Sequence, residues 1–472
     1  MSNQSRKKSR IQLSGANRRD FIKYSVAVGA LLGLDRWKVF EATEATAGVA
    51  LANEMACATT NRSVHIIAGD GGFAWFNLLW PHYDVAQAAN PAFAYHAPGM
   101  GALASGSDKP LFFGPEAPWQ NLGSSKFVTC FMAGTNETHK QNPTSSSMIS
   151  GGTGLFATCA ALQTANPTLV PVIGVNAPKT ALPYGGAPGA PNIAEVGSSD
   201  GLVDLFNSAA SSAMGTLANP KDASLYEAYY KGFLGLNAAA GRSTFARGYR
   251  TGQVAANLLG INLSAQLRPS ASDLTRYGVG APSTPTKLTE LAKGLITTAK
   301  AFKLGLTSSV LLPAMEDDPH PAFADMATLR MTVTALGAML DAFMADLRLL
   351  DDPTCAGSKI ADNVVISIHG DTPKDPLTAA GWPDGTQGNS NWVYVMGAGW
   401  MKTGWFGGIR RNGDFYGFDL STGLDVKDQM STVTAMPAAA AIAYAVTKGD
   451  MRRVSDFYKG ADISGIVRPK QM

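Results

Sequence analysis

Charge is scarce in this chain. Asp, Glu, Lys and Arg make up 16% of its 472 residues, against about a quarter in an average soluble protein. Hydrophobic residues make up 45%, which is enough for a sizeable core and excludes wholesale disorder. The net charge of +3 is unevenly placed: residues 1–40 hold nine basic and two acidic residues, and the other 432 hold 30 basic and 34 acidic. The body is therefore not basic, which argues against nucleic acid as a partner.

Long hydrophobic runs are also lacking. No stretch reaches the roughly 20 apolar residues of a membrane-spanning helix, so we expect no transmembrane segment in the mature chain. Residues 24–34 form an uncharged run directly after the sequence RRDFIK at 18–23. This layout resembles a twin-arginine (Tat) signal, which exports folded proteins. An ordinary basic amphipathic helix is the alternative.

We therefore predict a Tat signal peptide and cleavage region over residues 1–47 and a single large domain over residues 48–472. The small residues at 45–47 and 50–52 mark two cleavage sites. The Tat export machinery is the first expected partner. The mature protein is expected in the periplasm or at the cell surface, with its signal peptide removed.

Cysteine is rare, and its spacing fits no zinc motif. The four cysteines are Cys57, Cys130, Cys159 and Cys355. An oxidising compartment permits disulfides, and Cys130 with Cys159 is the pair to test. Buried free thiols are the favoured state, because Tat cargo folds before it reaches that compartment.

Six short apolar runs predict buried strands of a mostly parallel sheet, because they do not alternate with polar residues. They cover residues 64–68, 126–132, 170–175, 309–312, 364–369 and 392–396. Apolar residues at three- and four-residue steps predict helices over 321–350 and 287–304. Residues 177–201 and 268–285 read as loops. Strands alternating with helices predict an α/β fold: a doubly wound, mostly parallel sheet flanked by helices.

Polar residues that can do chemistry follow four of these strands. Ligands of open α/β sheets bind beyond the carboxyl ends of the strands, and hard divalent metals take carboxylate and imidazole ligands from several loops. A hydroxyl beside such a metal becomes a nucleophile. The candidate ligands of one divalent metal are Asp70, Asp318, His320, His369 and Asp371. The candidate catalytic residues are Thr138, as nucleophile, and His139.

Each candidate has a structural alternative. Asp70 precedes two glycines and also fits a turn. Asp318 lies just before a predicted helix, in the sequence Asp318-Pro319-His320, and also fits an N-cap. Thr138 and His139 also fit a solvated loop, and Asp371 a capped turn. Three other histidines, at positions 65, 82 and 96, are expected in packing or surface roles.

Several motifs in order suggest a family. From about residue 62 to the end, the chain resembles the exported bacterial family called domain of unknown function 1501, which is related to the alkaline phosphatase and sulfatase superfamily. The similar segments are residues 69–77 with Pro81 (Gly-Gly-x-Asp-Gly-Leu-Asn turn in the family), 138–139 (Ser-His), 317–320 (Trp-Asp-Thr-His), 367–373 (Ser-Glu-Phe-Gly-Arg-Thr-Pro) and the glycine-rich 395–404. The resemblance implies an alkaline-phosphatase-like scaffold acting on phosphate or sulfate esters, including those of polysaccharide.

The chain also departs from that family. Ile368 stands where the family has Glu, and Asp371 where it has Arg. Residues 385–388 read Gly-Thr-Gln-Gly in place of Gly-Thr-Asp-His, so a carboxylate and an imidazole are missing. One divalent metal, or none, is therefore expected. Two hypotheses stay open: a hydrolase with a degraded metal site, or a non-catalytic envelope protein that binds glycan or another protein.

Four tryptophans crowd into 24 residues near the C-terminus. Exposed indole rings stack on sugars, whereas buried ones pack a core. We expect core packing rather than glycan binding for these residues. They are Trp382, Trp392, Trp400 and Trp405.

Overall fold

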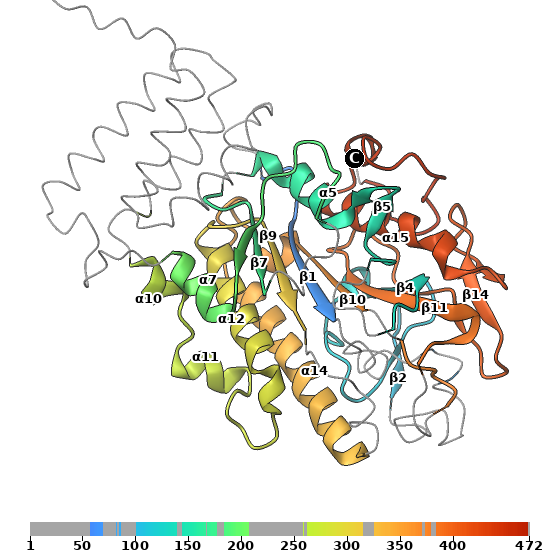
Figure 1. The fold of residues 1–472 in the computed structure, drawn as a ribbon, viewed down its shortest axis with the longest axis horizontal. Coiled ribbons are helices and arrows are strands. Elements are labelled where there is room, and N and C mark those ends of the chain that lie inside the picture. Colours follow the sequence, from blue (N-terminus) through green and yellow to red (C-terminus); the bar gives the residue numbers. More distant parts are fainter. Residues whose placement is uncertain are drawn as a thin grey trace, which may run out of the picture.

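The structure is a computed structural model that describes residues 57–68, 82, 85, 101–138, 144–166, 168–176, 184–206, 258, 262–314, 325–370, 373–378 and 384–470. Its largest element is a sheet of eight described strands in the order β12-β4-β11-β10-β1-β9-β7-β8 (Figure 1). These strands are β1 (Arg62–Ala68), β4 (Val128–Thr135), β7 (Val172–Val175), β8 (Ala194–Val196), β9 (Ser309–Pro313), β10 (Val364–Gly370), β11 (Ser390–Met396) and β12 (Gly404–Phe406).

The sheet is mostly parallel. β1 pairs in parallel with β10 on one side and with β9 on the other. β7, β8 and β12 also join their neighbours in parallel. β11 is the exception, because it runs antiparallel to both β10 and β4. Every residue of β1, β10 and β11 is buried, as expected of strands covered on both faces.

Helices cover both faces. Val64 and Ile66 of β1 belong to a core shared with α7, α12 and α14, whereas Ile67 belongs to a second core shared with α5 and α15. The described helices are α5 (Leu155–Leu162), α7 (Ser199–Leu205), α10 (Leu263–Leu267), α11 (Ala271–Arg276), α12 (Thr289–Lys303), α14 (Met326–Leu349), α15 (Ser431–Val446) and α16 (Met451–Val454). Short 3₁₀ helices lie at Ser124–Lys126, Gln163–Ala165, Thr286–Leu288, Ile360–Asn363 and Gln387–Asn389.

Three small sheets accompany the large one. β13, β14 and β15 form an antiparallel sheet in that order. β2 pairs with β3, and β5 with β6. Their bounds are Ala102–Leu103 (β2), Phe112–Phe113 (β3), Met148–Ser150 (β5), Thr153–Gly154 (β6), Gly408–Ile409 (β13), Phe415–Phe418 (β14) and Asp425–Lys427 (β15).

The α/β architecture and all six predicted strands are confirmed. The helix expected over 287–304 is present as Thr286–Leu288 and α12, and the one expected over 321–350 is described from Met326. Two loop predictions were wrong. Residues 177–201 include β8 and the start of α7, and residues 268–285 include α11, where Ser270 and Asp273 form a capping box.

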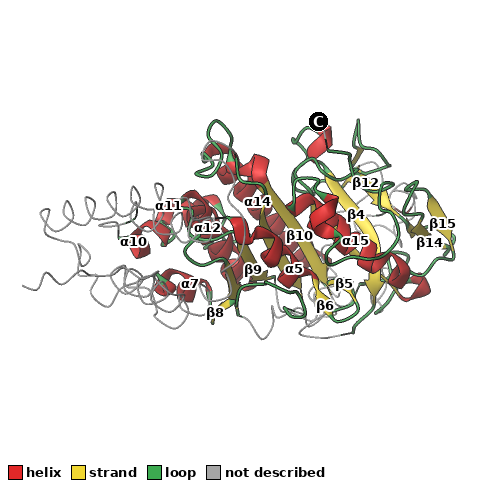
Figure 2. Ribbon diagram, turned by 90° about the horizontal axis from the view of Figure 1, so that it is seen from above, coloured by secondary structure: helices red, strands yellow, loops and turns green. Residues whose placement is uncertain are grey.

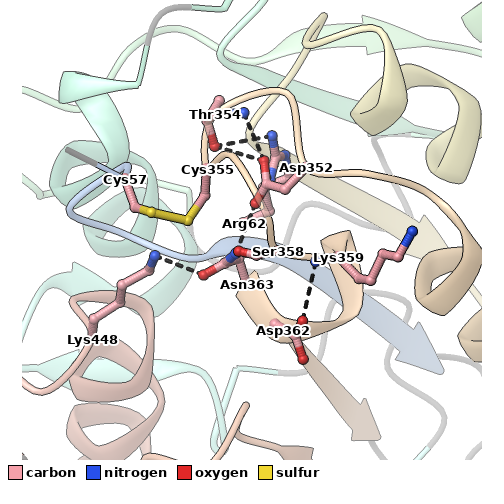
Figure 3. The surroundings of a disulfide bond; sticks show 10 residues. All are labelled: Cys57, Arg62, Asp352, Thr354, Cys355, Ser358, Lys359, Asp362, Asn363 and Lys448. Atoms are coloured by element: carbon pink, nitrogen blue, oxygen red, sulfur yellow. Dashed lines mark hydrogen bonds and ion pairs between the residues drawn. A yellow bond between two sulfur atoms is a disulfide. The ribbon is translucent and has the colours of Figure 1, made fainter. Parts of the chain in front are cut away.

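A disulfide and a buried ion pair hold the start of β1. Cys57 is bonded to Cys355, 298 residues away (Figure 3). The favoured state of buried free thiols is confirmed for Cys130 and Cys159 and is wrong for Cys57 and Cys355. Spacing along the chain could not indicate Cys57 with Cys355, because only the folded β1 brings them together.

The ion pair lies beside this disulfide. Arg62 Nη1 is 2.9 Å from Asp352 Oδ1, and both side chains are almost fully buried. Asp352 also accepts hydrogen bonds from the backbone and hydroxyl of Thr354 and from Asn363 Nδ2, each at 2.8 Å (Figure 3). Burial lowers the pKa of Arg62, and Asp352 opposes that effect. The charge of Asp352 is thus compensated from several sides, as a buried carboxylate requires.

Asp352→Asn should lower the free energy of unfolding by about 3–5 kcal/mol, because it leaves the Arg62 guanidinium buried without its counter-charge. Asp351→Asn is the matched control. The neighbouring Asp351 pairs with Lys359 at the surface, so its loss should leave stability nearly unchanged. Urea denaturation of both variants measures the difference, and equal effects of the two substitutions would contradict the role of the buried pair.

Candidate functional site

The carboxyl ends of β1, β4, β9 and β10 meet at one edge of the large sheet. Asn391, at the start of β11, connects two of them, since its Nδ2 donates to Gly370 O at 3.0 Å and to Thr135 O at 3.2 Å. Ser431 Oγ, at the first residue of α15, donates to Gly134 O. Asn391 N in turn donates to Ser431 Oγ at 3.3 Å. Hydrogen bonds at this edge therefore connect β4, β10, β11 and α15, which are far apart in the sequence.

Six of the seven predicted site residues follow the strands that end at this edge, and the seventh, His369, lies within β10. Asp70 comes two residues after β1, and Asp371 directly follows β10. Five of the seven candidates lie outside the described residues, namely Asp70, His139, Asp318, His320 and Asp371. The structure describes the other two, Thr138 and His369.

Thr138 lies at the surface beyond β4, where its Oγ1 accepts a hydrogen bond from Asn136 Nδ2 at 2.9 Å. The preceding residue, Glu137, is buried and accepts hydrogen bonds from Thr144 N at 2.6 Å, Thr144 Oγ1 at 2.9 Å and Ser145 N at 2.7 Å. Glu137 thus joins the two ends of segment 138–144. This role could not be predicted from the sequence, because a single Glu outside any motif gives no indication of its hydrogen-bond partners.

His369 is fully buried near the end of β10. Its Nε2 is 2.8 Å from Ser367 Oγ, which is also 2.7 Å from Nδ1 of the buried His65. One hydroxyl therefore connects two imidazoles of adjacent strands, and the ring of Phe156 contacts both. The packing role expected for His65 matches this position.

Burial lowers the pKa of His369 to about 3, although the backbone of Ser146 lies close enough to oppose this effect in part. Its Nδ1 makes no hydrogen bond of normal geometry. Burial also lowers the pKa of His65. Both rings are therefore neutral at pH 7, the protonation state in which imidazole binds metals. The neutral Nδ1 of His369, which the backbone of Ser146 approaches, is the nitrogen of the described edge that could serve as a metal ligand.

The other charged side chains described near this edge form ion pairs or hydrogen bonds. Lys374, buried just after the β10 end, pairs with Asp384. Asp375 accepts hydrogen bonds from Leu377 N at 2.8 Å and from Gln387 Nε2 at 3.2 Å. Within the described part of the chain, no three His, Cys, Asp or Glu side chains gather as a metal site. Two residues of 385–388 bond to residues 373–375, since Gly385 N donates to Pro373 O and Gln387 Nε2 donates to Asp375 Oδ1.

Core packing is confirmed for two of the clustered tryptophans. Trp392 and Trp405 are buried, and the ring of His82 contacts them at centroid distances of 5.1 and 4.0 Å. Trp400 is half-buried, and Trp382 lies outside the described residues. Burial, with a smaller effect of the charge of Arg410, lowers the pKa of His82 to about 3. His82 is therefore a packing residue, as expected.

Comparisons with protein families, with curated proteins and with solved structures return no match for this chain. No helix among the described residues is long and apolar enough to cross a membrane.

Because His82 is held neutral in the fold, acid should destabilise the protein. Below pH 6.5 the unfolded state binds a proton that the folded state does not, so stability falls as pH falls from 6.5 toward 3. His82 alone should lower the free energy of unfolding by about 2 kcal/mol between pH 6.5 and pH 5. Urea denaturation at both pH values tests this, with His82→Asn as the variant. A pH dependence unchanged in that variant would contradict the assignment.

Proposed function

We propose that this is an exported protein whose sheet edge forms a metal-dependent site that hydrolyses phosphate or sulfate esters, on an alkaline-phosphatase-like scaffold. The observation that carries the proposal is the meeting of four strand ends at one edge, each followed by the candidate residues. Esters on surface polysaccharide are the substrates that fit an envelope location.

Export is supported by the disulfide between Cys57 and Cys355, because such bonds persist in oxidising compartments and are rare in the cytosol. The two remaining thiols are buried and are thereby shielded from oxidation. The twin arginines at positions 18 and 19 and the near-neutral body fit a chain that is folded before it is exported.

Replacing Arg18 and Arg19 by Lys should trap the precursor in the cytoplasm, because the Tat machinery reads this pair as an address. Cell fractionation measures the result.

The exported wild-type protein, denatured without reductant, should show two reactive thiols, and four after reduction. Normal export of the double variant would contradict the Tat assignment, and four thiols without reduction would contradict the disulfide.

The site residues take distinct roles in this proposal. Asp70, Asp318, His320 and Asp371 would hold one divalent cation, together with Nδ1 of His369. Such an ion polarises the ester oxygens and lowers the pKa of a bound water. The Oγ1 of Thr138 would attack the phosphorus or sulfur and give its proton to His139, and the ester bond to the alcohol would break as His139 passes this proton to the leaving oxygen. Water would then release the bound phosphate or sulfate and restore the Thr138 hydroxyl.

Asp318→Ala should abolish metal binding and ester turnover, because it removes a charged ligand. Elemental analysis of the mature protein and a panel of phosphate and sulfate esters measure both. The matched control is Asp204→Asn, at an exposed position of α7, which should change neither. No bound divalent ion and no turnover by the wild-type protein would overturn the hydrolase proposal.

One observation favours the second candidate function, a non-catalytic protein that binds glycan or another protein. Gln387 and Gly388 stand where the family that the chain resembles has a carboxylate and an imidazole. The side chain of Gln387 donates a hydrogen bond to Asp375. Binding to a polysaccharide array without turnover, unaffected by Asp318→Ala, would support this candidate over the hydrolase.

A further inference from the structure

Exposed apolar side chains gather in one short stretch of the chain. The described residues include seven large hydrophobic side chains that are exposed, and five of them fall within residues 424–436. Clustered apolar exposure of this kind marks interaction surfaces more often than single exposed residues do. We call these five the 424–436 patch; with their exposed fractions they are Leu424 (67%), Val426 (36%), Met430 (39%), Val433 (56%) and Met436 (42%).

The patch combines a strand and a helix that follow each other directly. Leu424 directly precedes β15 and Val426 lies within it, two residues on, so their side chains share one face of the small sheet. Met430, Val433 and Met436 recur at three-residue steps at the start of α15, which places them on one helix face. Figure 2 shows β14 and β15 at the end of the molecule opposite α10 and α11.

β15 is an edge strand, since β14 is its sole partner among the described strands. Asp428 N donates to Phe415 O, and Asp419 N donates to Leu424 O. Hydrogen-bonded pairs alternate along an antiparallel ladder. The register therefore directs the N–H and C=O groups of Val426 toward β14 and those of Asp425 and Lys427 away from it. The free edge thus offers two donors and two acceptors, one of each on either side of Val426.

We propose that two copies of this chain associate through β15, antiparallel about a two-fold axis at Val426. This register pairs Asp425 of one protomer with the partner's Lys427, and Lys427 with the partner's Asp425. Because all four residues direct their backbone groups outward, the register forms four hydrogen bonds between protomers. Two three-stranded sheets then become one of six strands, by the edge-to-edge strand addition known from peptide recognition.

Charge and shape favour a second copy as the occupant. The two-fold register places opposite charges across the interface twice, whereas a parallel arrangement in register would face like charges. Side chains of Asp425 and Lys427 lie on the face opposite Val426, where Asp425 pairs with Lys109 and Arg410 and Lys427 with Asp414. In the dimer the partner's Lys427 faces Asp425, so the carboxylate of one network lies opposite the ammonium group of the other.

The apolar face is self-complementary in the same register. Val426 meets the partner's Val426 directly, and Leu424 of each protomer flanks this contact. A two-fold axis buries the same patch on both copies, as an isologous interface requires. Met430, which caps α15, and Met436 within it are exposed a few residues further along the chain. Met is enriched in the buried centres of interfaces because its flexible thioether adapts to the opposing surface.

Cysteine cross-linking tests the register. In the proposed dimer the two Val426 positions form a non-hydrogen-bonded pair with Cα atoms about 4.5 Å apart, which a disulfide spans. Val426→Cys should therefore give a covalent dimer on mild oxidation of the mature protein. Leu424→Cys is the matched control. It is more exposed, but its two copies would lie about 14 Å apart, four residues along the strand, and should not cross-link.

The mass in solution tests the association itself. Light scattering of the mature wild-type protein should give twice the mass of one chain. Val426→Lys should give a monomer, because it places two ammonium groups on the axis. Lys459→Glu, which reverses a charge at an exposed position outside the 424–436 patch, should leave the dimer intact. Thermal unfolding confirms that both variants fold. A monomeric wild-type protein, or cross-linking of Leu424→Cys as efficient as that of Val426→Cys, would overturn the proposal.

Discussion

The position of β1 between β10 and β9 is the constraint on which the rest of the structure depends. Its parallel ladders on both sides fix where β1, β9 and β10 end, and hence where the candidate residues begin. Its faces are unlike: Val64 and Ile66 enter one core, and Ile67 the other. A slip by one residue would exchange these faces, so burial on both sides specifies the register.

Polar contacts add a second specification on the face toward α5. Ser63 Oγ is 3.0 Å from Ser309 Oγ of β9, and Gln163 Nε2 reaches Ser63 Oγ at 3.2 Å. Further along, Ser367 connects His65 with His369. Burying a polar group without a hydrogen-bond partner costs free energy. The polar side chains of β10, β1 and β9 find their partners in only one register of these strands. The polar groups therefore select among registers that apolar packing would leave close in energy.

Local sequence was informative wherever one segment determines its own structure. Apolar runs located the six strands, but they carry no direction, so the antiparallel β11 could not be read from residues 392–396. The helix α15 gave no amphipathic pattern, because its alanines 438–441 are buried and no polar face interrupts them. Cys57 with Cys355 depends on tertiary structure alone.

In the candidate site, too, the sequence indicated local features and not those that depend on tertiary structure. The apolar runs predicted strands whose ends precede the candidate residues, and β1, β4, β9 and β10 do run in the same direction and end at one edge. The roles of Asn391 and Glu137 could not be predicted, because each depends on hydrogen bonds to backbone groups of other segments. Such residues hold loops in place and leave no spacing pattern in the chain.

Helix α15 connects the two surfaces that the proposals concern. Its first residue, Ser431, donates to Gly134 O at the sheet edge, and Thr434 Oγ1 donates to Met132 O of β4. Val433, between them, points outward in the 424–436 patch. The inward side of the first helical turn thus fixes the end of β4, while its outward side is free to contact a second copy. A dimer formed on the outward side therefore leaves the hydrogen bonds that close the candidate site unchanged.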